Sequence, residues 1–226
     1  NQGRNVFGAC MVAIGDADGM VTGITRRFPE CYTDVKRVID VEPDRVPMGY
    51  SIVVARHGTV FLADTAINET PSPEELATIA RQMARNARQM GHEPRVAFLS
   101  FSNFGSREIE RIDRIRKAIR ILQAEKVDFE FDGEMQADMA LDYELLRETY
   151  PFCRLTGPAN VLVMPGLHSA HISSRLMQRL GGVTVIGPVI DGLAKPVQIV
   201  QMGATVSDLV NHAALAAYGA LSRRRK

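Results

Sequence analysis

Short strand-like runs alternate with helix-like segments along most of the chain, and this alternation restricts the fold more than any other feature. Residues 50–55 and 96–100 are β-rich runs, for example, and helical spacing of apolar residues appears between and after them. The helix after Ser72 has the clearest start, because a serine N-cap precedes Pro73 at the first helical position. Alternation of this kind predicts an α/β fold with a largely parallel sheet.

The turns that follow the strands are the places where chemistry is expected, because ligands bind at the carboxyl ends of the strands in such sheets. One of these turns, residues 100–106, places serines, an asparagine and a glycine between a strand and a helix. Backbone N–H groups at the start of that helix would favour an anion such as phosphate. Plain N-capping by Ser102 or Ser106 explains the same residues structurally, so both interpretations stay open.

Two further pairs of side chains have the chemistry of a site. Asp16 and Asp18 could hold a metal or share a proton, although a structural turn explains them as well. His168 and His171 are three residues apart and could face one metal ion, but no third ligand stands at a supporting spacing. The chain also lacks the GxSxG, P-loop and GxGxxG patterns. Residue types alone therefore predict an α/β domain with anion-friendly turns.

Charge and cysteine content exclude several classes of function. The chain has 27 Lys and Arg against 26 Asp and Glu, so no global field would recruit nucleic acid or an anionic membrane. Cys10, Cys31 and Cys153 are far apart and odd in number, and we expect a reducing, cytoplasmic compartment. No apolar run reaches the roughly 18 residues of a membrane span. Asn1 stands close to an apolar helix that we expect to be buried, residues 6–14, which suggests a piece of a longer polypeptide.

Five motifs in order along the chain carry a resemblance to a known family. They are residues 15–19 (GDADG), 100–102 (SFS), 132–136 (DGEMQ), 157–161 (GPANV) and 192–196 (GLAKP). The ordered set resembles the phosphate acetyltransferase family across essentially the whole chain. The resemblance implies two α/β/α subdomains with largely parallel sheets, in an architecture like that of isocitrate and isopropylmalate dehydrogenases, with an N-terminal part missing.

The same resemblance divides the chain. Residues 1–40 and 189–226 would be the remnant of the first subdomain, and residues 41–188 would form the second subdomain and supply a homodimer contact. The sequence has its own break near this boundary, where Pro43 and Pro47 bound a linker.

Several positions depart from the catalytic members of the family, which transfer acetyl between phosphate and the thiol of CoA. Gln201 and Met202, just before Gly203, stand where those members carry a Ser-Arg pair. Phe28 and Thr33 stand at the places of a second catalytic Ser or Thr and a phosphate-binding Arg. The resemblance therefore implies that cationic and hydroxyl groups needed for acetyl transfer are lost.

Other charged residues are kept or gained. Asp208 matches an aspartate proposed to help deprotonate the CoA thiol, although Thr205-x-x-Asp208 is also a capping box for the last helix. Arg26 and Arg27 lie beside the altered segment and could compensate for a lost arginine.

Residues 16–27 resemble a variant of the family, the C-terminal part of large bacterial NADP-dependent malic enzymes. The resemblance implies a regulatory domain that binds acetyl-CoA as an allosteric effector and lacks acetyl transfer activity. NADP and a divalent metal would bind only in the malic enzyme domain, joined in cis, and the chain would self-associate as a dimer or a higher homo-oligomer. The alternatives are an active phosphate acetyltransferase and an assembly domain without a ligand. The residues expected at the ligand site are Lys195, Gln201, Met202, Gly203, Asp208, Arg26, Arg27, Phe28 and Thr33.

Overall fold

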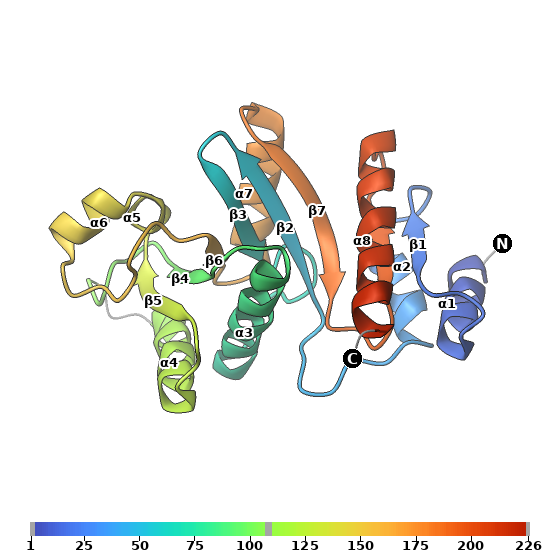
Figure 1. The fold of residues 1–226 in the computed structure, drawn as a ribbon, viewed down its shortest axis with the longest axis horizontal. Coiled ribbons are helices and arrows are strands. Elements are labelled where there is room, and N and C mark those ends of the chain that lie inside the picture. The colour runs from blue at the N-terminus through green and yellow to red at the C-terminus, as the bar shows by residue number, and fades with distance from the viewer. Residues whose placement is uncertain (1–2, 107–109, 225–226) are drawn as a thin grey trace. The chain divides into compact units, whose positions relative to one another are not determined.

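The computed structural model describes residues 3–106 and 110–224, and the chain divides into two compact units (Figure 1). Unit 1 comprises Asn1–Gly49 and Ile186–Lys226, and unit 2 comprises Tyr50–Val185. The sequence placed these boundaries near residues 40 and 189. In the described residues, no helix is both long and apolar enough to cross a membrane.

Unit 1 is built around two parallel strands. Strand β1 pairs with β8 from Met20↔Val197 to Gly23↔Val200. Three helices pack with these strands, and the core includes Ala9, Val35 and Ile199. The elements are α1 (Arg4–Ile14), β1 (Met20–Gly23), α2 (Phe28–Lys36), β8 (Val197–Val200) and α8 (Val206–Arg224).

Helix α1 differs from the prediction in its burial. The sequence indicated a helix that is buried nearly all round, but Phe7 is 69% exposed and Ile14 is 74% exposed. Only Asn5, Ala9 and Val12 are buried, and these residues lie on one side of the helix. Apolar composition predicts that a face will be covered, but it does not show which neighbour covers it.

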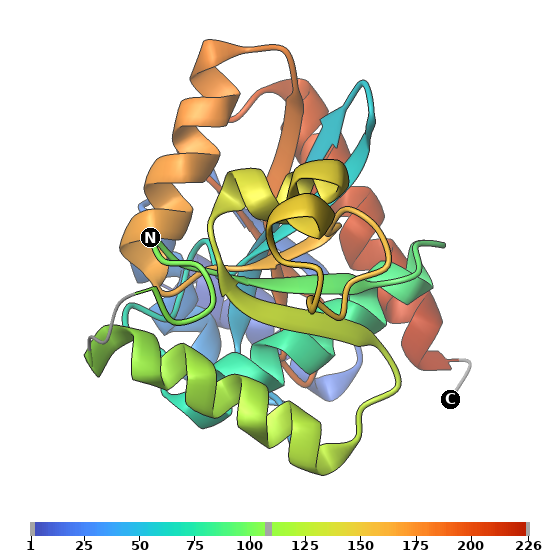
Figure 2. The same cartoon turned by 90° about the vertical axis from the view of Figure 1, so that its left-hand side faces the viewer.

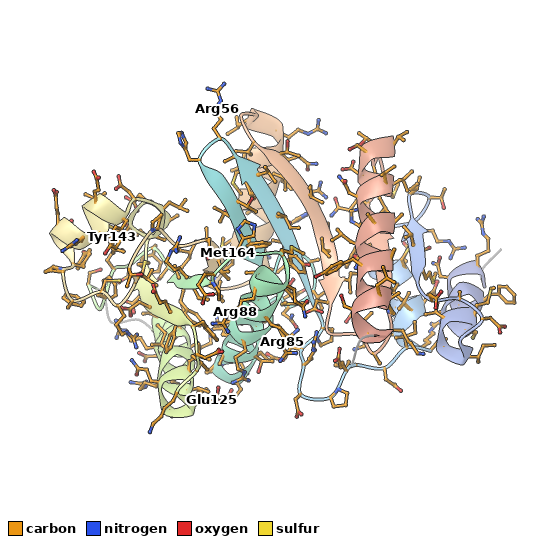
Figure 3. The ribbon with its side chains drawn as sticks, in the orientation of Figure 1. Arg56, Arg85, Arg88, Glu125, Tyr143 and Met164 are labelled. Atoms are coloured by element: carbon orange, nitrogen blue, oxygen red, sulfur yellow. The ribbon has the colours of Figure 1, made fainter. Side chains whose placement is uncertain are left out.

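Unit 2 contains most of a six-stranded sheet. The strand order is β5-β4-β6-β3-β2-β7, in which β2 and β3 form an antiparallel hairpin, whereas β3, β6, β4 and β5 are mutually parallel. Arg56, labelled in Figure 3, projects from the tip of this hairpin. The strands are β2 (Met48–Ala55), β3 (Gly58–Ala63), β4 (Arg95–Leu99), β5 (Glu130–Met135), β6 (Val161–Val163) and β7 (Thr184–Asp191), the last of which returns the chain to unit 1.

Helices lie on both faces of this sheet. Helices α3 and α4 pack side by side on one face, and α7 lies on the other (Figure 2). The helices are α3 (Pro73–Gln89), α4 (Glu110–Glu125), α5 (Ala137–Leu141), α6 (Tyr143–Thr149) and α7 (Leu167–Leu180). The α/β fold with largely parallel sheets that the sequence predicted is confirmed.

Local signals explain where several elements begin. Glu75 N–H donates to Ser72 Oγ at 3.2 Å and Ser72 N–H donates to Glu75 Oε2 at 2.7 Å, a capping box that starts α3 as predicted. Residues 132–134 lie inside β5. Helices α5 and α6 are separate, because the Asp142 side chain caps a new helix by accepting from Leu145 N–H at 3.1 Å.

Candidate functional site

The candidate site lies at the carboxyl ends of β1 and β8 in unit 1. Because the two strands are parallel neighbours, Gly23 and Val200 end at the same edge. Residues 24–27 lead from β1 to the start of α2, and residues 201–205 lead from β8 to the start of α8. Two helix N-termini therefore follow one sheet edge, and their backbone N–H groups favour an anion there.

Glycine is required at the end of β1. Gly23 has φ +116°, which a residue with a side chain rarely adopts. A Cβ atom at this position would overlap the carbonyl oxygen of Val200 on the paired strand. The close approach of β1 to β8 at the site therefore depends on Gly23.

A pocket of about 380 Å³, called here the unit 1 pocket, opens beside this edge. Its walls are residues 20–26, Cys31 and Leu209, together with Arg4, Asn5 and Gly8 from α1. Arg4 and Arg26 are two positively charged residues of the lining, which agrees with the preference of the helix N-termini for an anion.

Two hydrogen bonds and an ion pair connect the pocket wall to Arg26. Thr22 Oγ1 donates to Asn5 Oδ1 at 2.6 Å, and Asn5 Nδ2 donates to Asp34 Oδ2 at 3.2 Å. Arg26 Nη1 lies 3.9 Å from the same Asp34 oxygen. Asn5 is only 7% exposed, so the network is largely shielded from water. Asp34 thereby restrains Arg26 at the pocket.

Cys31 is buried in the same wall. Burial raises the pKa of the Cys31 thiol, and a hydrogen bond with Asn5 opposes this with a smaller effect. The thiol therefore stays protonated at neutral pH, and its surroundings are not those of a reactive thiolate.

The loop after β8 carries little charge. Met202 is 60% exposed, Gln201 is half-buried and Gly203 is exposed with φ +79°. Asp208 Oδ2 accepts from both the N–H and the hydroxyl of Thr205 at 2.8 Å, so Asp208 completes the predicted capping box of α8. Its carboxylate is thus already engaged within the helix start.

The remaining predicted residues lie in different surroundings. Phe28 stacks on Tyr32, with ring centroids 6.1 Å apart, and the Thr33 hydroxyl donates to Pro29 O at 2.8 Å within α2. Arg27 is the exposed N-cap residue of α2. Lys195 precedes β8 and therefore lies at the opposite end of this strand from residues 201–203.

Sequence reasoning missed Arg4, Asn5 and Thr22, because only the tertiary fold brings α1 to the end of β1. One signal was available. Asn5 is a polar residue that directly precedes the apolar run 6–14, and it is buried in the structure. A buried amide of this kind requires hydrogen-bonding partners, which Asp34 and Thr22 supply.

The predicted turn at residues 100–106 lies in unit 2 and is tied to a buried carboxylate. Glu134, 1% exposed, accepts from Arg116 Nε at 3.0 Å, from Gly105 N–H at 2.8 Å and from the Ser102 hydroxyl at 3.2 Å. Burial alone would raise the pKa of Glu134, but the bonds from Arg116 and Gly105 outweigh it and lower this pKa. Ser102 therefore has an internal structural partner.

The aspartate and histidine pairs do not assemble into larger clusters. Across residues 3–106 and 110–224, no three His, Cys, Asp or Glu side chains are grouped so that they could hold a metal ion. His168 and His171 are both exposed near the start of α7. Partial desolvation of its ring, with the charges of Arg175 and His168, lowers the pKa of His171 even though the residue as a whole is exposed.

Comparison with known proteins gives consistent matches. Residues 1–217 match the phosphate acetyl/butaryl transferase family. The chain is 54% identical to an NADP-dependent malic enzyme of Rhizobium meliloti, over 97% of the chain but only 29% of that protein. It is 33% identical to a phosphate acetyltransferase of Clostridium acetobutylicum, over 92% of the chain and 65% of that protein. The structure of a phosphotransacetylase from Streptococcus pyogenes superposes with a TM-score of 0.90 at 33% identity, covering 96% of this chain and 67% of the other.

Proposed function

Because the chain belongs to the phosphate acetyl/butaryl transferase family, we propose that it is a regulatory module that binds acetyl-CoA without transferring its acetyl group at an ordinary enzyme rate. It would act within a larger polypeptide that oxidises malate with NADP, and NADP and a divalent metal would bind in the catalytic part. The similarity to the malic enzyme of Rhizobium meliloti supports this context.

The observation that carries the proposal is the chemistry of the loop after β8. Residues 201–205 contain no lysine or arginine, and Met202 is exposed at the site edge. Acetyl transfer between a thiol and phosphate develops negative charge on the carbonyl oxygen and on the phosphate, and donors or cations must stabilise this charge. Methionine cannot supply such a donor. Loss of a single donor typically lowers the rate by about 10²–10³.

Binding of acetyl-CoA requires fewer positioned groups than acetyl transfer does, and the site has positive groups that suit an anionic ligand. Arg4 and Arg26 line the unit 1 pocket, and two helix N-termini begin at the same edge. The volume of 380 Å³ lies near the lower end of the range of about 300–1,000 Å³ for small-molecule pockets. The pocket would thus hold one end of acetyl-CoA, with the rest of the ligand outside it.

Regulation adds one physical requirement. Acetyl-CoA must bind two states of the whole polypeptide with unequal affinity, since a ligand that binds both equally shifts nothing. Self-association of the module would give a route by which binding in one copy influences another.

Titration of the intact native polypeptide with acetyl-CoA, followed by calorimetry and by the rate of malate oxidation, tests the proposal. We expect binding, and a lower rate of malate oxidation once acetyl-CoA is bound. Arg26→Gln should weaken acetyl-CoA binding by roughly tenfold or more, because it removes a charged hydrogen-bond donor. Arg37→Gln is the matched control, since Arg37 also contacts Asp34 but is 67% exposed.

Absence of acetyl-CoA binding would contradict the proposal and would favour an assembly domain without a ligand. Equal losses of acetyl-CoA affinity in Arg26→Gln and Arg37→Gln would show that the weaker binding comes from the lost contact with Asp34 and not from a contact between Arg26 and the ligand.

An active phosphate acetyltransferase is the second candidate, and one observation favours it. Arg4 and Arg26 place two cations at the pocket, where they could replace an arginine lost elsewhere. Turnover of acetyl phosphate and CoA at about 1–10³ per second would establish this alternative.

A further inference from the structure

Unit 2 contains a cavity that the proposed function does not use. It has a volume of about 930 Å³ and lies beyond the carboxyl ends of β4 and β6. We refer to it as the unit 2 crevice. Its walls include Ser100, Phe101, Ile115, Met164 and Ser169. Met164, labelled in Figure 3, directly follows β6.

The topology explains why a crevice forms at this point. Strands β4 and β6 are parallel neighbours, paired from Val96↔Val161 to Phe98↔Val163. After β4 the chain passes through α4 to β5 on one side, whereas after β6 it passes through α7 toward β7 at the other end of the sheet. The two connections therefore separate, and α4 and α7 lie on opposite faces (Figure 2). Crevices at such switch points are where open α/β sheets bind ligands.

The charge of the crevice favours an anion. Arg114 of α4 lines it, is half-buried and donates from Nη1 to Pro71 O at 3.0 Å. Among the side chains that the structure describes, which leave out Glu108 and Glu110 near the start of α4, no carboxylate forms an ion pair with Arg114, whereas Arg116 on the same helix is paired with Glu134 at 3.0 Å. The crevice thus contains a guanidinium without a described ion-pair partner.

The opposite wall of the crevice also favours an anion. Helix α7 has 14 residues and begins at the crevice. Its first N–H group, of Leu167, donates to Glu69 O at 3.2 Å, and no side chain caps the helix start. The positive end of the helix dipole therefore faces the cavity. Glu69 also lines the crevice, but it is exposed to solvent and its charge is correspondingly screened.

Much of the remaining lining is apolar, although Thr70, Ser100, His168 and Ser169 also line the crevice. Leu99, Ile112, Ile115 and Met164 form apolar wall. The loop that carries Phe101 is fixed because Gln136 Nε2 donates to Phe101 O at 2.7 Å. A preformed apolar cavity with few polar groups is typical of small-molecule sites.

We propose that the unit 2 crevice binds a small organic anion, with its apolar body against the aliphatic wall and its carboxylate or phosphate head between Arg114 and the start of α7. The proposal is independent of the acetyl-CoA proposal, which rests on residues of unit 1.

Ligand-observed NMR on the intact native polypeptide tests this with three probes that share one apolar chain: hexanoate, hexyl phosphate and hexan-1-ol. We expect the anions to bind more tightly than the alcohol, and the tighter anion identifies the preferred head group. Arg114→Gln should weaken binding of that anion by roughly tenfold to hundredfold, since it removes a charged donor. Arg114→Lys should retain most of the affinity because it keeps the charge.

Arg120→Gln is the matched control, because Arg120 is exposed on the same helix and does not line the crevice. An unchanged melting temperature of Arg114→Gln shows that the bond to Pro71 is not needed for folding. If Arg114→Gln has a lower melting temperature than the wild type, Arg114→Lys replaces it in the test. Arg114→Lys should still bind hexanoate more tightly than hexan-1-ol. The proposal fails if no anion binds at millimolar concentration, if hexan-1-ol binds as well as the anions, or if Arg114→Gln and Arg120→Gln bind alike.

Discussion

At the scale of single residues, the positions of charged groups support the proposed binding role. Arg26 is restrained at the unit 1 pocket by Asp34, whereas Asp208 is engaged with Thr205 at the start of α8. The cations that remain can hold an anionic ligand. The loop at residues 201–203 carries no cationic side chain that could stabilise a developing negative charge.

Glu134 allows a residue-scale prediction in unit 2. Glu134→Ala would leave Arg116 and Gly105 without their buried acceptor. We expect a loss of about 3 kcal/mol in the free energy of unfolding, measured by chemical denaturation. Glu148→Ala, exposed on α6, is the control and should change the stability by less than about 0.5 kcal/mol. Equal losses in both variants would contradict the assigned role.

The pH dependence of stability provides a separate prediction for Glu134. Its pKa is lowered in the folded state, so the unfolded state binds the proton more readily. The stabilisation is therefore fully present above the ordinary carboxyl pKa and is lost as the pH falls through the lowered value. Denaturation curves of Glu134→Gln should show a smaller loss of stability on acidification than those of the wild type. An equal loss of stability on acidification in Glu134→Gln and in the wild type would contradict the prediction.

At the scale of elements, the pairing of β1 with β8 positions the candidate site. Gly23→Ala would place a Cβ against Val200 O, and we expect it to lower the free energy of unfolding by more than about 4 kcal/mol. Gly15→Ala is the matched control. Gly15 also has a positive φ, +92°, but no atom lies within 4 Å of its added Cβ. The free energy of unfolding of this control should fall by only about 1–2 kcal/mol, and chemical denaturation measures both variants.

The start of α8 tests whether Asp208 has a structural role. Thr205→Ala removes the N-cap hydroxyl and should lower the free energy of unfolding by about 1 kcal/mol while leaving acetyl-CoA binding within about twofold. Ser207→Ala, exposed in the same turn, should have no effect on either measurement. Loss of acetyl-CoA binding in Thr205→Ala would indicate that this cap contacts the ligand.

The sequence predicts most elements because helical spacing, N-caps and β-rich runs are local signals. Ser72 and Glu75 show this, since their capping box lies where the pattern placed a helix start. Strand β8 was missed because it has only four residues, directly after a Lys-Pro pair, which is too short for a periodic signal. The exposed face of α1 could not be predicted, since exposure depends on which element packs against it.

At the scale of the whole molecule, the sequence could locate the site loops but not the complete pocket. Arg26 and residues 201–203 follow strands that the fold places side by side, and motif order pointed to them. Arg4 and Asn5 lie far from them in sequence and reach the pocket only through the packing of α1. For the unit 2 crevice, the sequence indicated the turn at residues 100–106, of which Ser100 and Phe101 line the cavity, but not the cavity itself, because a switch point depends on strand order.

The most direct test of the account is acetyl phosphate formation by the intact native polypeptide. Acetyl-CoA would be added until calorimetry shows that its binding is saturated, and phosphate would then be supplied. A phosphotransacetylase would be assayed in parallel as the reference. The account predicts saturable binding with acetyl phosphate formation at least about 10²-fold below the reference rate. Formation of acetyl phosphate at the reference rate would contradict it.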